Sequence, residues 1–254
     1  MLRVLAFLIG LLASVQSGLA RGDFDRLIEA ARAAEAALDS ARALELYLDA
    51  DRLRPNNAVV LQKIAQQYSD LVVEQNNERA EKQFAQTALD YAQRAAALDP
   101  QNAINVLSLA VCHGKLALYS DTRTKLEYSR LVKVETERAL ALDPRYAWAH
   151  HVLGRWHLEL ASLGNTKRFF VRLIYGELPP ASVEQAIAAL ERAVELEPDE
   201  LAHPLELGFA YLAGGQKAKA RAQFQAGLAM PSRRKHDDAA KARARVALAE
   251  LDAN

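Results

Sequence analysis

Apolar and small residues recur along this chain in a fixed order that ends each time at a proline. In one copy Ala186, Leu190 and Ala193 precede Pro198, and the same spacing recurs elsewhere. The other copies are Ala43, Tyr47, Ala50 and Pro55; Ala88, Ala92, Ala95 and Pro100; Val132, Thr136, Ala139 and Pro144; and, one residue shorter, Ala220, Phe224, Gly227 and Pro231. Residues at this spacing lie on one face of an α-helix, and proline cannot continue a helix. The pattern therefore predicts a series of helices, each with a narrow face that packs closely on another helix and each ending near its proline.

A second pattern lies upstream of each of these helices. Leu207, Gly208 and Tyr211 supply a large, a small and an aromatic residue at helical spacing. Similar sets are Leu153, Gly154 and His157, and Ile64, Ala65 and Tyr68, with weaker sets at Leu109, Ala110 and His113 and at Ala30, Ala31 and Ala34. The two patterns together are those of helix A and helix B of a tetratricopeptide (TPR) repeat, a helical hairpin of about 34 residues.

The sequence thus predicts an all-α fold, a right-handed TPR-like solenoid of helical hairpins with about five helix pairs and a C-terminal capping helix. The units cover about 23–56, 57–101, 102–145, 146–199 and 200–232, and the cap covers 237–252. From the period, the second, third and fourth units carry about 10, 10 and 20 additional residues between their two helices. Such insertions lengthen helices or form loops on one rim of the stack.

Composition and charge narrow the classes of function. Hydrophobic residues make up 51% of the 254 residues and aromatic residues only 7%, which is typical of closely packed helices. Basic and acidic side chains are balanced at 32 each, so no overall basic field attracts nucleic acid. The sequence has no phosphate-binding glycine loop, nucleophile elbow or Cys-x-x-Cys motif, and His150, His151 and His157 have no carboxylate at a metal-ligand spacing among them. We therefore expect a non-catalytic binding protein without a metal or cofactor.

The first residues have the pattern of a targeting segment. A basic start at Arg3 is followed by a short apolar run and by a small-x-small site that ends at Ala20. This pattern predicts a secretory signal peptide over residues 1–20 and an exported protein, periplasmic or secreted, because the run is short for a membrane span. An uncleaved N-terminal anchor is the alternative.

In a TPR stack the residues that face the concave groove lie on helix A. They stand at fixed sequence offsets from the central small residue of that helix. In the last three units this face is largely apolar and includes one arginine. The predicted ligand groove consists of Ile104, Leu107, Val111, Trp148, His151, Arg155, Leu158, Leu205, Phe209 and Leu212. An apolar cleft with a single cation suits a lipid or another amphiphile with an anionic head group, or a peptide with an acidic end. The alternative is that these side chains only pack on neighbouring helices.

Two basic segments lie outside the helix pattern. In the fourth insertion three cations alternate with large apolar residues: Lys167, Arg168, Phe169, Phe170, Arg172, Leu173 and Ile174. As an amphipathic helix this segment predicts a lid over the groove or a peripheral contact with a membrane, and burial against helix B of its own unit is the alternative. The second segment, residues 233–236, is expected to be a solvated loop before the cap, and a role in binding phosphates is the alternative.

The fourth unit also resembles a known family. The run from Ala147 to Trp156, the segment from Tyr175 to Ser182 and the helix that ends before Pro198 resemble the regulator of microtubule dynamics family. That family includes a mitochondrial tether that interacts with a tyrosine phosphatase. The resemblance implies a TPR-like domain without catalytic chemistry, which in the tether is similar to a phospholipid-binding module. A lipid or amphiphile is therefore the first expected ligand, and a protein-protein interaction scaffold that binds a peptide or partner protein is the alternative. The apparent secretion signal, in place of the family's membrane anchor, departs from this pattern.

Overall fold

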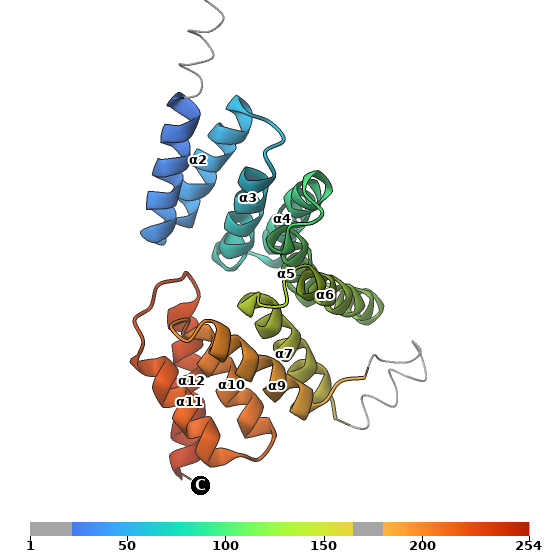
Figure 1. The fold of residues 1–254 in the computed structure, drawn as a ribbon, viewed down its shortest axis with the longest axis vertical. Helices are drawn as coiled ribbons and strands as arrows, with labels where there is room; N and C mark the ends of the chain where they lie inside the picture. The colour runs from blue at the N-terminus through green and yellow to red at the C-terminus, as the bar shows by residue number, and fades with distance from the viewer. Residues whose placement is uncertain (1–21, 165–179, 254) are drawn as a thin grey trace, which may run out of the picture.

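The protein is described by a computed structural model that covers residues 22–164 and 180–253, and every regular element in those residues is helical. The first helix occupies residues 22–36. The labelled elements are α2 (Ser40–Leu53), α3 (Ala58–Leu71), η1 (Val72–Glu74), α4 (Glu78–Leu98), α5 (Ala103–Leu118), α6 (Thr122–Leu142), α7 (Ala147–Ala161), α9 (Val183–Leu196), α10 (Ala202–Ala213), α11 (Lys217–Ala229) and α12 (Asp237–Ala253). They form the five predicted pairs and the final cap, stacked in an arc (Figure 1).

The second helix of each pair ends two residues before its proline. Thus α2 ends at Leu53 before Pro55, and α9 ends at Leu196 before Pro198. All members of the small-residue stripe are buried, including Thr136 in α6 and Gly227 in α11. The stripe is therefore the surface on which each second helix packs, as its spacing predicts.

The insertions in the second and third units lengthen helices. Helices α4 and α6 each have 21 residues, whereas α2 has 14 and α11 has 13. Each long helix begins after an N-cap residue whose side chain accepts a backbone hydrogen bond. Asn77 caps α4 by accepting from the N–H of Ala80, and Asp121 caps α6 by accepting from the N–H of Thr124.

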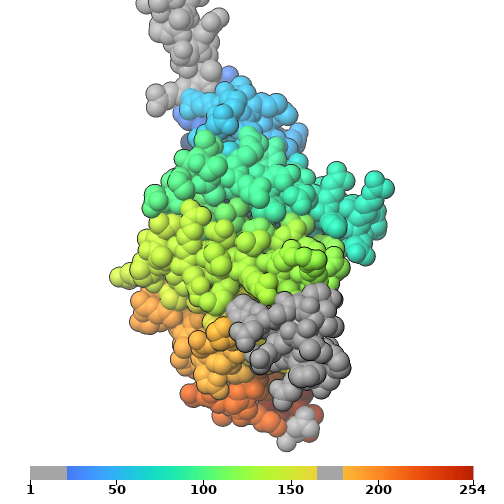
Figure 2. Space-filling view, turned by 90° about the vertical axis from the view of Figure 1, so that its right-hand side faces the viewer, coloured from blue at the N-terminus to red at the C-terminus, as the bar shows by residue number. Residues whose placement is uncertain are grey.

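The two helices of each unit pack on each other and each unit packs on the next, so the core runs along the stack as a series of clusters. Figure 2 shows the units as successive bands along the long axis of the molecule. The final helix, α12, contacts both α11 and α10, and its buried Ala244, Ala247 and Leu251 cover the end of the last pair. This is the role predicted for the cap.

Two segments predicted from the sequence lie outside the described residues. They are the signal peptide over residues 1–20 and the lid residues between Lys167 and Ile174. Among the helices that the structure describes, none has both the length and the hydropathy of a membrane span.

Candidate functional site

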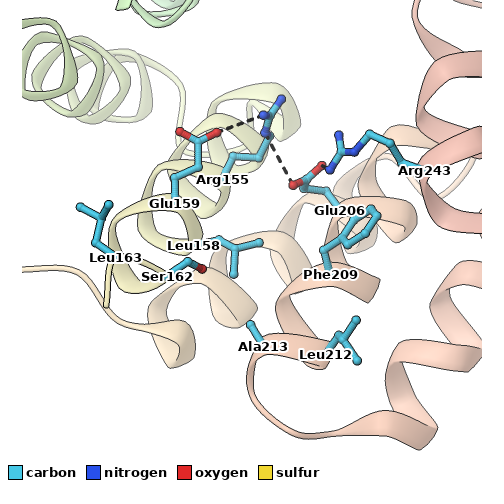
Figure 3. Close-up of a pocket in the computed structure, with 10 residues that line it drawn as sticks. All are labelled: Arg155, Leu158, Glu159, Ser162, Leu163, Glu206, Phe209, Leu212, Ala213 and Arg243. Atoms are coloured by element: carbon cyan, nitrogen blue, oxygen red, sulfur yellow. Dashed lines mark hydrogen bonds and ion pairs between the residues drawn. The ribbon is translucent and has the colours of Figure 1, made fainter. Parts of the chain in front are cut away.

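An open cleft of about 580 Å³ lies between α7, α10 and α12 (Figure 3). Leu158 of α7 and Phe209 and Leu212 of α10 give it an apolar side. Phe209 is fixed by an edge-to-face contact with Phe224, with ring centroids 4.9 Å apart. The apolar side of the cleft is thus anchored in the core of the last unit.

Charged groups line the opposite side of the cleft. Arg155 of α7 donates a hydrogen bond to Glu159 at 3.1 Å, and its Nε lies 3.6 Å from Glu206 Oε1. Arg243 of α12 lies 3.7 Å from the second oxygen of Glu206, and its guanidinium stands 4.7 Å above the ring of Phe209. The Glu206 side chain is 12% exposed, whereas those of Arg155 and Arg243 are about half exposed. One largely buried carboxylate therefore holds two guanidinium groups at the mouth of the cleft.

The cleft brings together only part of the predicted groove. Arg155, Leu158, Phe209 and Leu212 line it. The prediction of a single cation differs from the structure, because Arg243 adds a second cation and two glutamates balance the pair.

The remaining groove positions fall elsewhere. Leu107 and Leu205 are only 3% and 2% exposed and belong to the hydrophobic core, because neighbouring helices cover the face on which they lie. These two positions agree with the packing alternative and present no surface to a ligand. Ile104 and Val111 are exposed on α5, but neither lines this cleft.

Trp148 and His151 belong to an aromatic cluster with His203 of α10. The Trp148 ring centroid lies 5.0 Å from both imidazole rings. The Nδ1 atoms of His151 and His203 are 3.0 Å apart, so one ring donates its N–H and the other accepts through a lone pair. The acceptor ring must be unprotonated at Nδ1 for this bond to exist.

Burial sets the charge state of the histidine pair. His203 is fully buried and His151 is 6% exposed. Burial, together with the charge of Arg234, lowers the pKa of His203 to about 4. Burial also lowers the pKa of His151 well below its usual value, with smaller contributions from His203 and Arg155. Both rings are therefore neutral near pH 7, and His151 is a core residue and not a lining of the groove.

The basic run at 233–236 is not a free solvated loop. The guanidinium of Arg234 lies 4.7 Å from the centroid of Trp148, and its Nε pairs with Glu200. Lys235 pairs with Glu74 of the second unit. His236 Nε2 lies 3.2 Å from Asp70 Oδ1. The segment thus crosses the inner side of the arc from the last pair to the N-terminal units (Figure 1).

Some site residues fall outside the predicted groove. Glu206 stands two positions before Gly208 and is therefore absent from the TPR groove spacing, and Arg243 belongs to the cap. A sequence signal for Arg243 is its place on a helix predicted to cover the last pair. Glu206 has no comparable signal.

Within the described residues, no group of three or more His, Cys, Asp or Glu side chains is placed to hold a metal ion. Cys112 is buried, and burial raises the pKa of its thiol to about 12. A thiolate is thus strongly disfavoured at this position near pH 7.

The stacked helical hairpins and the cleft at their C-terminal end define a TPR-type repeat protein. The structure is similar to a crystal structure of a thermophilic TPR protein from Thermus thermophilus, with a TM-score of 0.66 and 19% identity over 91% of this chain and 100% of that one. It is also similar to the Pseudomonas aeruginosa pilF protein, with a TM-score of 0.54 and 14% identity over 91% of this chain and 93% of that one. These similarities confirm the fold.

The chain belongs to the regulator of microtubule dynamics protein 1-3 family, whose model matches residues 25–252. It is 27% identical over 154 residues to regulator of microtubule dynamics protein 3 of Xenopus laevis, a match that covers 61% of this chain and 33% of that protein. It is 24% identical over 144 residues to regulator of microtubule dynamics protein 1 of Bos taurus, covering 56% and 45%. The matched region thus spans between a third and half of these two relatives.

The relatives overturn the expected location of the protein. They are proteins of Xenopus laevis, Bos taurus and Caenorhabditis elegans, and they are named as regulators of microtubules, which are polymers of the cell interior. The prediction of a periplasmic or secreted protein is therefore wrong. It rested on the apolar pattern of residues 1–20, and the repeat domain offers no independent support for it.

Proposed function

We propose that this chain is a non-catalytic scaffold that binds a segment of a partner protein in the cleft between α7, α10 and α12. The observation that carries the proposal is the pair of half-exposed guanidinium groups of Arg155 and Arg243 beside an apolar wall. The TPR-type fold of this chain also supports a binding role, because stacked helical hairpins create extended surfaces for binding.

The geometry favours one chemistry for this segment. Arg243 makes no hydrogen bond to a described residue; its contacts there are the ion pair with Glu206 at 3.7 Å and the ring of Phe209. Its N–H groups are thus available to a carboxylate, which a guanidinium binds through two parallel hydrogen bonds. Next to it, Phe209 and Leu212 suit a large apolar side chain. The proposed partner segment therefore carries an acidic residue beside an apolar one.

An amphiphilic ligand is less well supported than a peptide. Glu159 and Glu206 both line the cleft and repel an anionic head group and a peptide carboxylate alike, so the charge of the cleft does not separate the two ligands. The names of the family and of the matched proteins refer to microtubules and to TPR folds and not to lipids. A bound lipid is consequently an alternative outcome of the test and not the proposal.

We expect Arg243→Glu to weaken the binding of acidic-apolar peptides by about ten- to a hundredfold. A hydrogen bond to a charged group contributes about 1.5–3 kcal/mol, and about 1.4 kcal/mol corresponds to a tenfold change in affinity. Peptides are selected on the wild-type protein from a random display library, and their dissociation constants are then measured by calorimetry for each variant.

Arg245→Glu is the matched control, because Arg245 is exposed on the same helix and does not line the cleft. It makes the same charge change and is expected to leave affinity within about twofold. Equal losses for the two variants, or selected peptides without an acidic residue, would contradict the proposal. If the wild-type protein instead co-purifies with lipid in native mass spectrometry and Arg243→Glu does not, the amphiphile hypothesis replaces it.

A further inference from the structure

A second surface on the inner side of the arc is covered by the chain itself. We define the loop-covered surface as Trp148, Glu200, Glu74 and Asp70, whose side chains contact the cationic side chains and His236 of segment 232–236. These residues come from helices α3 and α7, from η1 and from the turn before α10. An aromatic face with three carboxylates around it is complementary to positive charge.

The contact at Arg234 is the most specific part of this surface. Its guanidinium stacks over the indole of Trp148 while its Nε pairs with a carboxylate oxygen of Glu200. The Glu200 side chain is only 13% exposed, and its other oxygen accepts a hydrogen bond from the backbone N–H of Ala202. The carboxylate is thus held in place by α10 independently of Arg234, and this half of an arginine site is preorganised.

Beside Arg234, two polar atoms of the aromatic cluster have no hydrogen-bond partner among the described residues. They are Nε1 of Trp148 and Nε2 of the fully buried His203, of which the second lies 3.5 Å from Oε2 of Glu197. An indole N–H can only donate, so a ligand that satisfies it must bring an acceptor such as a backbone carbonyl. Unpaired buried polar atoms are uncommon, and the indole N–H of Trp148 points to an incomplete set of contacts.

Segment 232–236 itself is weakly anchored. Its side chains are exposed or half-buried, and none of them is apolar. It is fixed at its C-terminal end, where the carboxylate of Asp237 accepts hydrogen bonds from the backbone N–H groups of Arg233 and Arg234, both at 2.7 Å. The remaining contacts are a hydrogen bond from Ser232 Oγ to Asp238, a long one from Lys235 Nζ to the carbonyl oxygen of Leu38, and cation-π and ion-pair contacts of about 1 kcal/mol each or less at an exposed site. A segment held in this way separates from the surface without disturbing the core.

We propose that segment 232–236 is an internal occupant of the loop-covered surface, and that this surface binds an arginine-containing basic segment of a partner protein, which displaces it. The proposed ligand places an arginine between Trp148 and Glu200 and a second cation near Glu74 and Asp70. Because the internal segment is tethered, its effective concentration is in the millimolar range, and it lowers the apparent affinity for a competing segment.

The test uses a fluorescein-labelled peptide with the sequence of residues 230–237 and fluorescence anisotropy. In the opened variant, Arg234→Ala with Lys235→Ala, the internal occupant loses its two main contacts. We expect this variant to bind the peptide at least tenfold more tightly than the wild-type protein. Adding Glu200→Gln, which keeps an acceptor for Ala202 but removes the charge, should weaken that binding at least tenfold.

Two controls separate this proposal from simpler explanations. A peptide with both arginines replaced by alanine should not bind the opened variant. If it binds as tightly as the original peptide, the arginines are not recognised and the proposal is overturned. No binding of the original peptide by a folded opened variant would also overturn it; if that variant does not fold, Arg234→Ala alone, which frees Trp148 and Glu200, gives the comparison. Arg243→Glu, which changes the cleft between α7, α10 and α12, should leave the binding of this basic peptide unchanged. The proposal for that cleft and the proposal for the loop-covered surface can therefore fail independently.

Discussion

Replacing Gly154 with leucine is expected to destabilise the protein by about 3 kcal/mol or more, the upper end of the usual effect of overpacking a core. Even a Cβ atom at this position would lie 2.5 Å from Cγ of Leu190 and 3.1 Å from the carbonyl oxygen of Ala186. The backbone of α9 cannot move away without separating the pair that it forms with α7. For a chain of this size the melting temperature should fall by roughly 6–12 °C.

Gly114 provides the matched control for this substitution. It also lies inside a helix, but a Cβ atom there would meet only Cγ2 of Val132, at an ordinary contact distance of 3.8 Å. Gly114→Ala should keep or raise the melting temperature, since glycine costs a helix about 0.5–1 kcal/mol relative to alanine. A thermal melt of Gly154→Leu that matches the wild type would contradict the close packing of α7 on α9.

Acid is expected to unfold the protein through the buried histidine pair. The folded state holds the pKa of His203 at about 4, against 6.5 for the unfolded chain. Between these values the unfolded state binds more protons than the folded state, so stability falls as the pH is lowered. His203 alone should remove about 3 kcal/mol of unfolding free energy between pH 7 and pH 4. Protonation of both rings would also break the hydrogen bond between them.

The double variant His151→Leu and His203→Leu isolates this effect from other titrating groups. It removes both partners of the hydrogen bond together, so no buried polar atom of the pair is left without a partner. Urea unfolding at a series of pH values should show a smaller loss of stability in acid than in the wild-type protein. If the two proteins lose the same free energy between pH 7 and pH 4, the pair is not the source of acid sensitivity.

The fold could be predicted because its main signals are local. Each proline marks the end of a second helix within two residues, and each stripe of small residues is buried as its spacing requires. The close approach at Gly154 follows from the same register. Such signals survive in a single sequence because a repeat unit is specified mainly by its own residues and its neighbours.

The candidate site was less predictable because it depends on contacts between units. TPR spacing places Leu107 and Leu205 on the groove face, but neighbouring helices bury them. Arg243 reaches the cleft from the cap, and Arg234 reaches Trp148 from the connection before it. No periodic pattern relates these positions, so a sequence that reveals the helices does not reveal which charged groups meet.

The contacts of segment 232–236 also change how the array is expected to unfold. In an open solenoid a terminal unit detaches at the cost of one interface, and the ends fray before the middle. Here Lys235 lies beside Glu74 and within 3.5 Å of the carbonyl oxygen of Leu38, so the C-terminal connection rests on the first and second units. Fraying of the N-terminal hairpin thus also removes one contact of segment 232–236. The two ends of the chain, distant in sequence, are coupled by about 1 kcal/mol or less, which is what such exposed contacts contribute.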